Sequence, residues 1–124
     1  MMEEGNHTRK TILIAEDNDS NYMLMSYILR KRYNIVRASD GQAAVDMACE
    51  GGIDLVLMDL KMPLVDGLEA TRIIRSRHND VPIVMLTANA FENDRQAAFD
   101  AGCNDFLSKP INSAICLETV EKYI

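Results

Sequence analysis

Four short apolar runs in this chain each end beside polar side chains that can take part in chemistry. The runs and the groups that follow them are Thr11–Ala15 with Glu16 and Asp17, Ile53–Met58 with Asp59, Ile83–Leu86 with Thr87, and Phe106–Ser108 with Lys109. Segments with helical spacing separate the runs, which is typical of parallel strands in an open α/β sheet. Because ligands of such sheets bind outside the carboxyl ends of the strands, the pattern predicts one pocket containing three carboxylates, a hydroxyl and an ammonium group.

The order of segments predicts five strands, each followed by a helix. Right-handed crossovers place helices on both faces, which gives a three-layer αβα sandwich with a flavodoxin-like parallel sheet of order 2-1-3-4-5. The first and third strands flank the point where this order reverses. We expect strands at about 11–16, 34–38, 54–58, 83–86 and 105–108, and helices that begin near residues 18, 40, 66, 91 and 113 and end near 32, 50, 77, 101 and 124.

The composition indicates one soluble domain of ordinary type. The 124 residues suffice for one core, expected over residues 10–124, with residues 1–9 as a flexible N-terminal tail or linker. A net charge of −6 argues against a nucleic-acid partner, and no apolar run approaches a membrane span, so we expect no direct membrane contact. The cysteines, Cys49, Cys103 and Cys116, have no metal-site spacing and are interpreted as reduced thiols of a cytoplasmic protein.

The predicted pocket is rich in carboxylates. Glu16 or Asp17 alone would fit a solvated helix N-terminus, but Asp59 at the end of the neighbouring strand makes that interpretation insufficient. Two unit charges about 4 Å apart repel by ~4 kcal/mol at an effective dielectric constant near 20. Three carboxylates therefore need a compensating cation, and Mg²⁺ suits them because it prefers carboxylate and water oxygens and shares them with phosphate.

The remaining polar groups suit phosphoryl chemistry. Asp59 follows four apolar residues, and an acid there costs stability unless it is paired or used. A carboxylate can act as a nucleophile and accept a phosphoryl group as an acyl phosphate. Lys109 can pair with the carboxylate and then with the phosphate, and Thr87 can donate a hydrogen bond to a phosphoryl oxygen. Each residue alone fits a structural role better, but together they favour function.

Four motifs carry a family resemblance. They are ILIAEDN at 12–18, LVLMDLKMPLVDG at 55–67, VPIVMLTA at 81–88 and AGCNDFLSKPI at 101–111. In this order they resemble the receiver domain of two-component response regulators, from about residue 10 to the C-terminus. The resemblance implies a phosphoacceptor that promotes its own phosphorylation and dephosphorylation and is not itself a kinase.

The resemblance also implies a role for each site residue. Asp59 would be the phosphoacceptor, and Thr87 and Lys109 would contact the phosphoryl group. Asp17, Asp59 and the backbone carbonyl of Lys61 would bind Mg²⁺, with Asp17 as a direct ligand. Glu16 would bind the ion through water. The Lys109–Pro110 peptide would be cis. Phe106 would be the switch aromatic and lacks the hydroxyl that a Tyr has there.

Further details resemble the receivers of hybrid sensor histidine kinases, namely EDNDSN, DGLEATRIIR, LTANA and DFLSKPI. The expected partners are then a histidine kinase or a histidine phosphotransfer protein. The expected output is a switched protein-interaction surface, and a phosphorylation-dependent homodimer is one form of it. A stand-alone single-domain response regulator is the alternative context.

Three other protein classes share parts of this pattern. An aspartyl-phosphate phosphatase of the haloacid dehalogenase type needs a second Asp two residues after the first, where this chain has Lys61. A flavodoxin cradles phosphate with a Ser, Thr and Gly-rich first loop, whereas this loop begins with Glu16 and Asp17. A degenerate receiver that only binds proteins usually lacks an acid, the Thr or the Lys, and this chain lacks none of them.

The first helix is a candidate docking face. Helical spacing places Leu24, Tyr27 and Ile28 toward the sheet and leaves Tyr22 and Met23 on or near the outer side. These two are expected to align a histidine-bearing donor with Asp59. Scattered surface hydrophobic residues are the alternative, and they are common.

Overall fold

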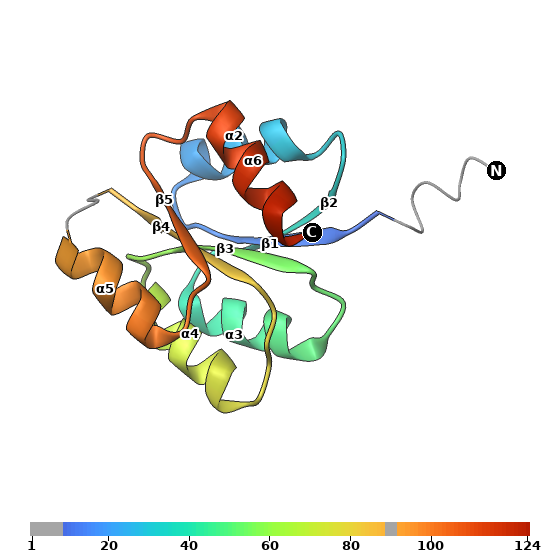
Figure 1. Ribbon diagram of the computed structural model, residues 1–124. Coiled ribbons are helices and arrows are strands. Elements are labelled where there is room, and N and C mark those ends of the chain that lie inside the picture. The colour runs from blue at the N-terminus through green and yellow to red at the C-terminus, as the bar shows by residue number, and fades with distance from the viewer. Residues whose placement is uncertain (1–8, 89–91) are drawn as a thin grey trace.

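Five parallel strands form one sheet of order β2-β1-β3-β4-β5. The structure is a computed structural model that describes residues 9–88 and 92–124 (Figure 1). The strands are β1 (Thr11–Ala15), β2 (Asn34–Ala38), β3 (Leu55–Asp59), β4 (Ile83–Thr87) and β5 (Asp105–Ser108). The helices are α2 (Asp19–Leu29), α3 (Gly41–Glu50), α4 (Gly67–Ser76), α5 (Glu92–Ala101) and α6 (Ser113–Tyr123). The predicted fold class and strand order are confirmed.

Helices cover both faces of the sheet. In Figure 1, α2 and α6 lie on one face, and α3, α4 and α5 lie on the other. Alternate strand residues enter the two cores: Ile12 and Ile14 pack with α2 and α6, and Leu13 and Ala15 pack with the opposite helices. All five residues of β3 are buried, because this central strand is covered on both sides.

Four helices begin at a polar cap. The side chains of Asn18, Asp40, Asp66 and Asn112 each accept a hydrogen bond from a backbone N–H of the first turn, at 2.8–3.0 Å. Such caps satisfy donors that have no partner inside the helix. These caps fix the first residues of α2, α3, α4 and α6 after the loops that follow the strands.

Some element boundaries differ from the prediction. Strand β1 ends at Ala15, because its pairing with β2 ends there, opposite Ala38. Strand β3 extends one residue further than expected and includes Asp59, which pairs with Leu86. Helix α2 ends at Leu29 rather than near residue 32. Arg9, expected in the tail, donates hydrogen bonds to the carbonyls of Arg30 and Tyr33, and residues 1–8 lie outside the described residues.

The predicted inner face of the first helix is wrong in part. Met25 and Leu29 are fully buried against the sheet, and Ile28 packs beside them. Leu24 and Tyr27, expected on that side, are 41% and 60% exposed. Apolar residues occur almost all round α2, so their spacing alone does not identify the buried stripe.

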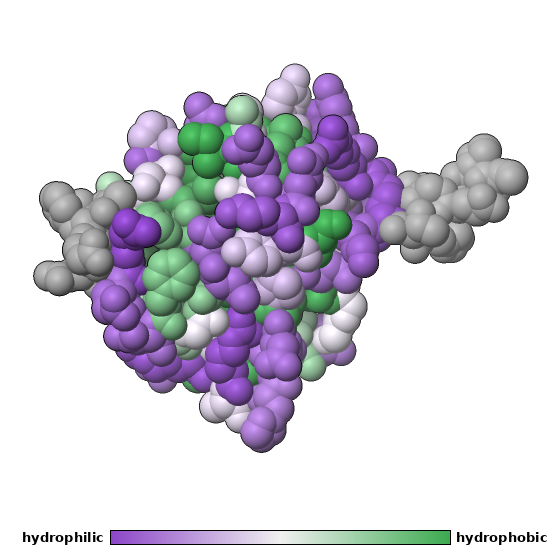
Figure 2. Space-filling model, viewed as in Figure 1, coloured by the Kyte–Doolittle hydropathy of each residue, from purple (hydrophilic) through white to green (hydrophobic). Residues whose placement is uncertain are grey.

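The visible surface is mainly hydrophilic, with hydrophobic residues exposed in small separate areas (Figure 2). Within residues 9–88 and 92–124, no helix combines the length and hydropathy needed to span a bilayer. The three cysteines are free, with Cys103 and Cys116 buried and Cys49 half-buried. Burial raises the pKa of the Cys103 and Cys116 thiols to about 11.

Candidate functional site

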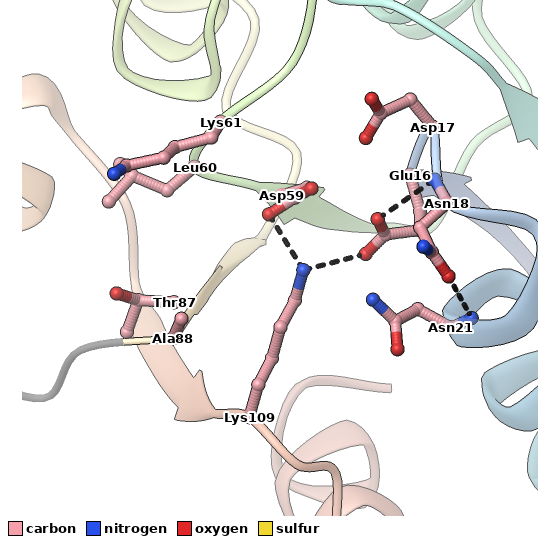
Figure 3. A pocket seen from close by; sticks show the side chains of 10 residues that line it. All are labelled: Glu16, Asp17, Asn18, Asn21, Asp59, Leu60, Lys61, Thr87, Ala88 and Lys109. Atoms are coloured by element: carbon pink, nitrogen blue, oxygen red, sulfur yellow. Dashed lines mark hydrogen bonds and ion pairs between the residues drawn. The ribbon is translucent and has the colours of Figure 1, made fainter.

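The carboxyl ends of four adjacent strands bring the predicted site residues into one pocket. Asp59 and Thr87 are the last residues of β3 and β4, the acid pair follows β1, and Lys109 follows β5. The pocket is lined by Glu16, Asp17, Asn18, Asn21, Asp59, Leu60, Lys61, Thr87, Ala88 and Lys109 (Figure 3). The register places these groups at one level, since Thr87 pairs with Ser108 and Asp59 with Leu86.

Lys109 is the cation at the centre of the site. Its Nζ lies 3.1 Å from Asp59 Oδ1 and 3.1 Å from Glu16 Oε1, so it bridges the two acids (Figure 3). Its backbone N–H donates to the Thr87 carbonyl at 2.7 Å, which anchors it to β4. Burial alone would lower the pKa of the ammonium, but the hydrogen bond and charge of Asp59, together with Glu16, raise it.

Glu16 is a buried acid in a crowded negative environment. Its side chain is fully buried, and burial followed by the neighbouring Asp59 carboxylate raises its pKa. Its Oε2 accepts a hydrogen bond from the Asn18 N–H at 3.2 Å. Its Oε1 has the ion pair with Lys109 but no well-aligned hydrogen bond among the described residues. Glu16 Oε1 can therefore accept a further interaction from a cation or from a water bound to one.

The donor set fits a hard divalent cation. One carboxylate oxygen from each of Glu16, Asp17 and Asp59 lies within 4.8 Å of the others. Carboxylates from a few residues, completed by water, are the environment that Mg²⁺ uses in phosphate-handling sites. Asp17 is exposed and Glu16 is buried, so the Asp17 carboxylate is the more accessible of the pair.

Residues at the ends of β4 and β5 form the other side of the pocket and its surroundings. Thr87 is buried, and the adjacent Ala88 is exposed and lines the pocket. The half-buried ring of Phe106 packs edge-on against Phe99 at 6.3 Å between centroids and lies under the Arg95 guanidinium at 4.7 Å. The Lys109–Pro110 peptide is cis. Residues 89–91, between Ala88 and α5, lie outside the described residues.

Comparison with known protein families identifies the family of this chain. The family model for the response regulator receiver domain matches residues 12–121. The chain belongs to this receiver-domain family. It is thereby a receiver domain of two-component systems, which confirms the resemblance in the four motifs.

Two relatives place the receiver domain in different settings. It is 36% identical over 123 residues to hybrid signal transduction histidine kinase I of Dictyostelium discoideum, covering 91% of this chain and 7% of that protein. It is 34% identical over 120 residues to the polar-differentiation response regulator DivK of Brucella anthropi, covering 93% of this chain and 96% of that protein. The receiver domain thus spans a small part of the kinase and almost all of DivK.

Two solved structures resemble the receiver domain along nearly its whole length. The receiver domain of sensor histidine kinase PA1611 from Pseudomonas aeruginosa, with magnesium coordinated in its active-site cleft, is 38% identical, with a TM-score of 0.87 over 94% of this chain and 98% of that one. The co-crystal of the Saccharomyces cerevisiae histidine phosphotransfer protein Ypd1 with the receiver domain of Ssk1 gives 34% identity and a TM-score of 0.88, over 93% of this chain and 88% of that one.

The sequence-based site omitted one residue of the receiver domain, Arg37. Its guanidinium contacts the Glu16 carbonyl and lies 4.4 Å from the Tyr22 ring centroid. Tyr22, expected on the outer side of the helix, is half-buried because it also packs against the core beneath α2, whereas Met23 is 66% exposed as expected. Arg37 has no local sequence signal for this contact, which depends on the register that pairs it with Ile14 of β1.

Replacing Glu16 with Gln should stabilise the metal-free receiver domain. Because the folded state raises the Glu16 pKa, its ionised form costs stability at neutral pH. The stability that Glu16 contributes is fully present below its unfolded pKa and is lost as pH rises through the folded pKa. We expect Glu16→Gln to gain about 1–2 kcal/mol in urea unfolding at pH 8 in EDTA, and the gain to vanish near pH 4. Glu50→Gln, at an exposed position, is the control, and an equal gain there would contradict this explanation.

Proposed function

We propose that this receiver domain accepts a phosphoryl group on Asp59 from a phosphohistidine of a partner protein in a two-component phosphorelay. One observation carries the proposal: Asp59 ends the buried central strand with its Oδ1 3.1 Å from Lys109 Nζ, beside two further acids. A carboxylate in that position is paired with a cation yet lies in an open pocket with room for a donor.

The transfer step uses the residues around Asp59. An Asp59 carboxylate oxygen forms a bond to phosphorus as the phosphorus–nitrogen bond of the donor breaks, and the imidazole leaves with the electron pair and takes up a proton. Lys109, whose raised pKa keeps it charged, stabilises negative charge on the phosphoryl oxygens. Thr87 donates to one phosphoryl oxygen, and the small Ala88 leaves space beside it.

Mg²⁺ is the proposed cofactor. Asp17, Asp59 and the Lys61 carbonyl would hold it directly, and Glu16 would do so through water. The three clustered carboxylates and the magnesium in the PA1611 receiver support this assignment. When bound, the ion supplies positive charge to the phosphoryl oxygens in the transition state.

Phosphorylation would be reported through Thr87 and Phe106. Thr87 moves toward the phosphoryl group, and the Phe106 ring turns inward into the space that this movement opens. The ring lacks a hydroxyl, so its packing between Arg95 and Phe99 sets its resting position. The change would bias a surface formed by α5, β5 and α6 between two states.

The proposed context is the receiver of a hybrid sensor histidine kinase, with residues 10–124 and the attached Arg9 as the folded unit. Similarity to the Dictyostelium hybrid kinase and the PA1611 receiver supports it. A histidine kinase or histidine phosphotransfer protein would be the partner in the cytoplasm, and the Ypd1 co-crystal supports the second. A stand-alone regulator, supported by the match to DivK, is the alternative, with a phosphorylation-dependent homodimer as one output.

Acetyl phosphate tests the chemistry without a partner protein. With Mg²⁺ it should add one phosphoryl mass to the receiver domain, and EDTA should prevent the addition. Asp17→Ala should show no Mg²⁺ binding in calorimetric titration, and its labelling rate should fall about 100-fold. Its unfolding in urea should match that of the wild type. Asp46→Ala, an exposed acid on α3, should label normally. Normal labelling of Asp17→Ala would contradict the assignment of Asp17 as a metal ligand.

A protein donor tests the docking face. Changing both Tyr22 and Met23 to Ser should slow transfer from a phosphorylated histidine phosphotransfer domain about tenfold, because apolar contacts that align the donor are lost. Labelling by acetyl phosphate should not change, since a small donor needs no docking surface. Ile115→Ser, a 52% exposed apolar residue on α6, is the matched control and should change neither reaction. An equal slowing with both donors would contradict docking at these residues.

A further inference from the structure

Arg37 lies outside the acceptor pocket and reaches its acid pair from the edge strand. It is the second-to-last residue of β2, paired with Ile14 in the register with β1. Its Nε and Nη2 donate to the Glu16 carbonyl oxygen at 3.2 and 3.0 Å, and Nη2 also lies 2.9 Å from Asp19 Oδ1. One guanidinium therefore ties the strand end, the loop and the first turn of α2 together.

These contacts complete the hydrogen bonding of the Glu16 backbone. Its N–H donates to the Ala38 carbonyl at 3.0 Å, which is the last bond between β1 and β2. Its carbonyl lies beyond the paired strand residues, and Arg37 supplies the donors. With both groups held from β2, the peptide joining Glu16 to Asp17 has a fixed orientation.

Asp17 depends on this orientation. Its side chain is exposed, and among the described residues no hydrogen bond or ion pair holds its carboxylate. The direction of that carboxylate is consequently set by the backbone on either side of it. The Glu16 Oε2 bond to the Asn18 N–H holds the following residue, and Arg37 holds the preceding peptide.

We infer that Arg37 is a positioning residue for the divalent cation: it holds the Glu16–Asp17 peptide so that both carboxylates face Asp59 before the ion binds. The inference rests on the proposed metal site. The charge of Arg37 acts in the opposite sense, since a cation near the pocket repels Mg²⁺. Asp19 neutralises that charge at 2.9 Å, so the positioning effect dominates.

The opposite signs of the two effects make Arg37→Met a decisive variant. It should weaken Mg²⁺ binding about tenfold in calorimetric titration, as loss of the groups that orient metal ligands does. Arg30→Met is the matched control, because Arg30 is also a cation on a tyrosine ring, 5.2 Å from the Tyr27 centroid, but makes no bond to Glu16. It should bind Mg²⁺ as the wild type does. Unchanged or tighter binding in Arg37→Met would overturn the inference.

A metal-free measurement separates this inference from the metal site itself. In EDTA, Arg37→Met should speed amide hydrogen exchange at Glu16 and Asn18 about tenfold relative to wild type and Arg30→Met, with core amides of β3 unchanged. Unaltered exchange at Glu16 and Asn18 would overturn the positioning role. A wild-type protein that binds no Mg²⁺ would instead overturn the proposed metal site.

Discussion

Asp59→Asn should abolish phosphorylation of this receiver domain. The amide is nearly the same size as the carboxylate, but it is a poor nucleophile and cannot form an acyl phosphate. Labelling by acetyl phosphate, followed as added mass, should fall by at least about 1,000-fold, to background. The fold should survive, because the amide oxygen can still accept the hydrogen bond from Lys109 at the Oδ1 position.

The control is Asp46→Asn, an exposed acid far from the strand ends. It should label as the wild type does. Asp59→Asn should also bind Mg²⁺ more weakly, because one of the three clustered carboxylates is gone. Undiminished labelling of Asp59→Asn with a native far-ultraviolet spectrum would show that another residue accepts the phosphoryl group.

Gly67→Ala should destabilise the receiver domain strongly. A Cβ at Gly67 would lie 2.2 Å from the Asp59 carbonyl oxygen and 3.0 Å from the Leu60 Cα. Gly67 is the first residue of α4, and its N–H donates to the Leu60 carbonyl at 2.9 Å, so neither side of the contact moves alone. We expect a loss of about 2–3 kcal/mol, which is ~8–12 °C in Tm for a domain of this size.

The same change should slow phosphorylation in the fraction that remains folded, because relief of the contact displaces Asp59. Gly51→Ala is the comparison, since its Cβ would meet nothing within 4 Å but its φ of +99° strains any side chain. That strain should cost about 1 kcal/mol and leave labelling unchanged. If Gly67→Ala were as stable as Gly51→Ala, the close contact between Gly67 and the Asp59 carbonyl would not limit the size of the residue at position 67.

The polar groups that follow the strands were predictable from the sequence, because buried parallel strands are continuous apolar runs and the polar residues after them stand out. That pattern placed Asp59, Thr87 and Lys109 at the carboxyl ends of adjacent strands. Polar caps located helix starts for the same reason, as at Asp40 and Asp66. Strand limits were less exact, because the end of β1 is set by its pairing with β2 rather than by local residues.

Contacts between segments were harder to predict. Seven of the eleven residues of α2 are apolar or aromatic and they lie all round the helix, so packing against the sheet, not periodicity, decides that Met25 is buried and Tyr27 exposed. Arg37 reads locally as an ordinary strand residue. Its contact with the Glu16 carbonyl becomes visible only once the register of β1 and β2 is known.

Chemical trapping of the phosphorylated residue tests the central claim most directly. The receiver domain would be labelled with acetyl phosphate and Mg²⁺, reduced with borohydride, digested and sequenced by mass spectrometry. Reduction of an aspartyl phosphate converts that residue to homoserine, which marks the site by its mass. We predict homoserine at position 59 alone, and none when EDTA is present during labelling. Homoserine at another acid, such as Asp17, or no reducible phosphate at all, would contradict the assignment of Asp59 as phosphoacceptor.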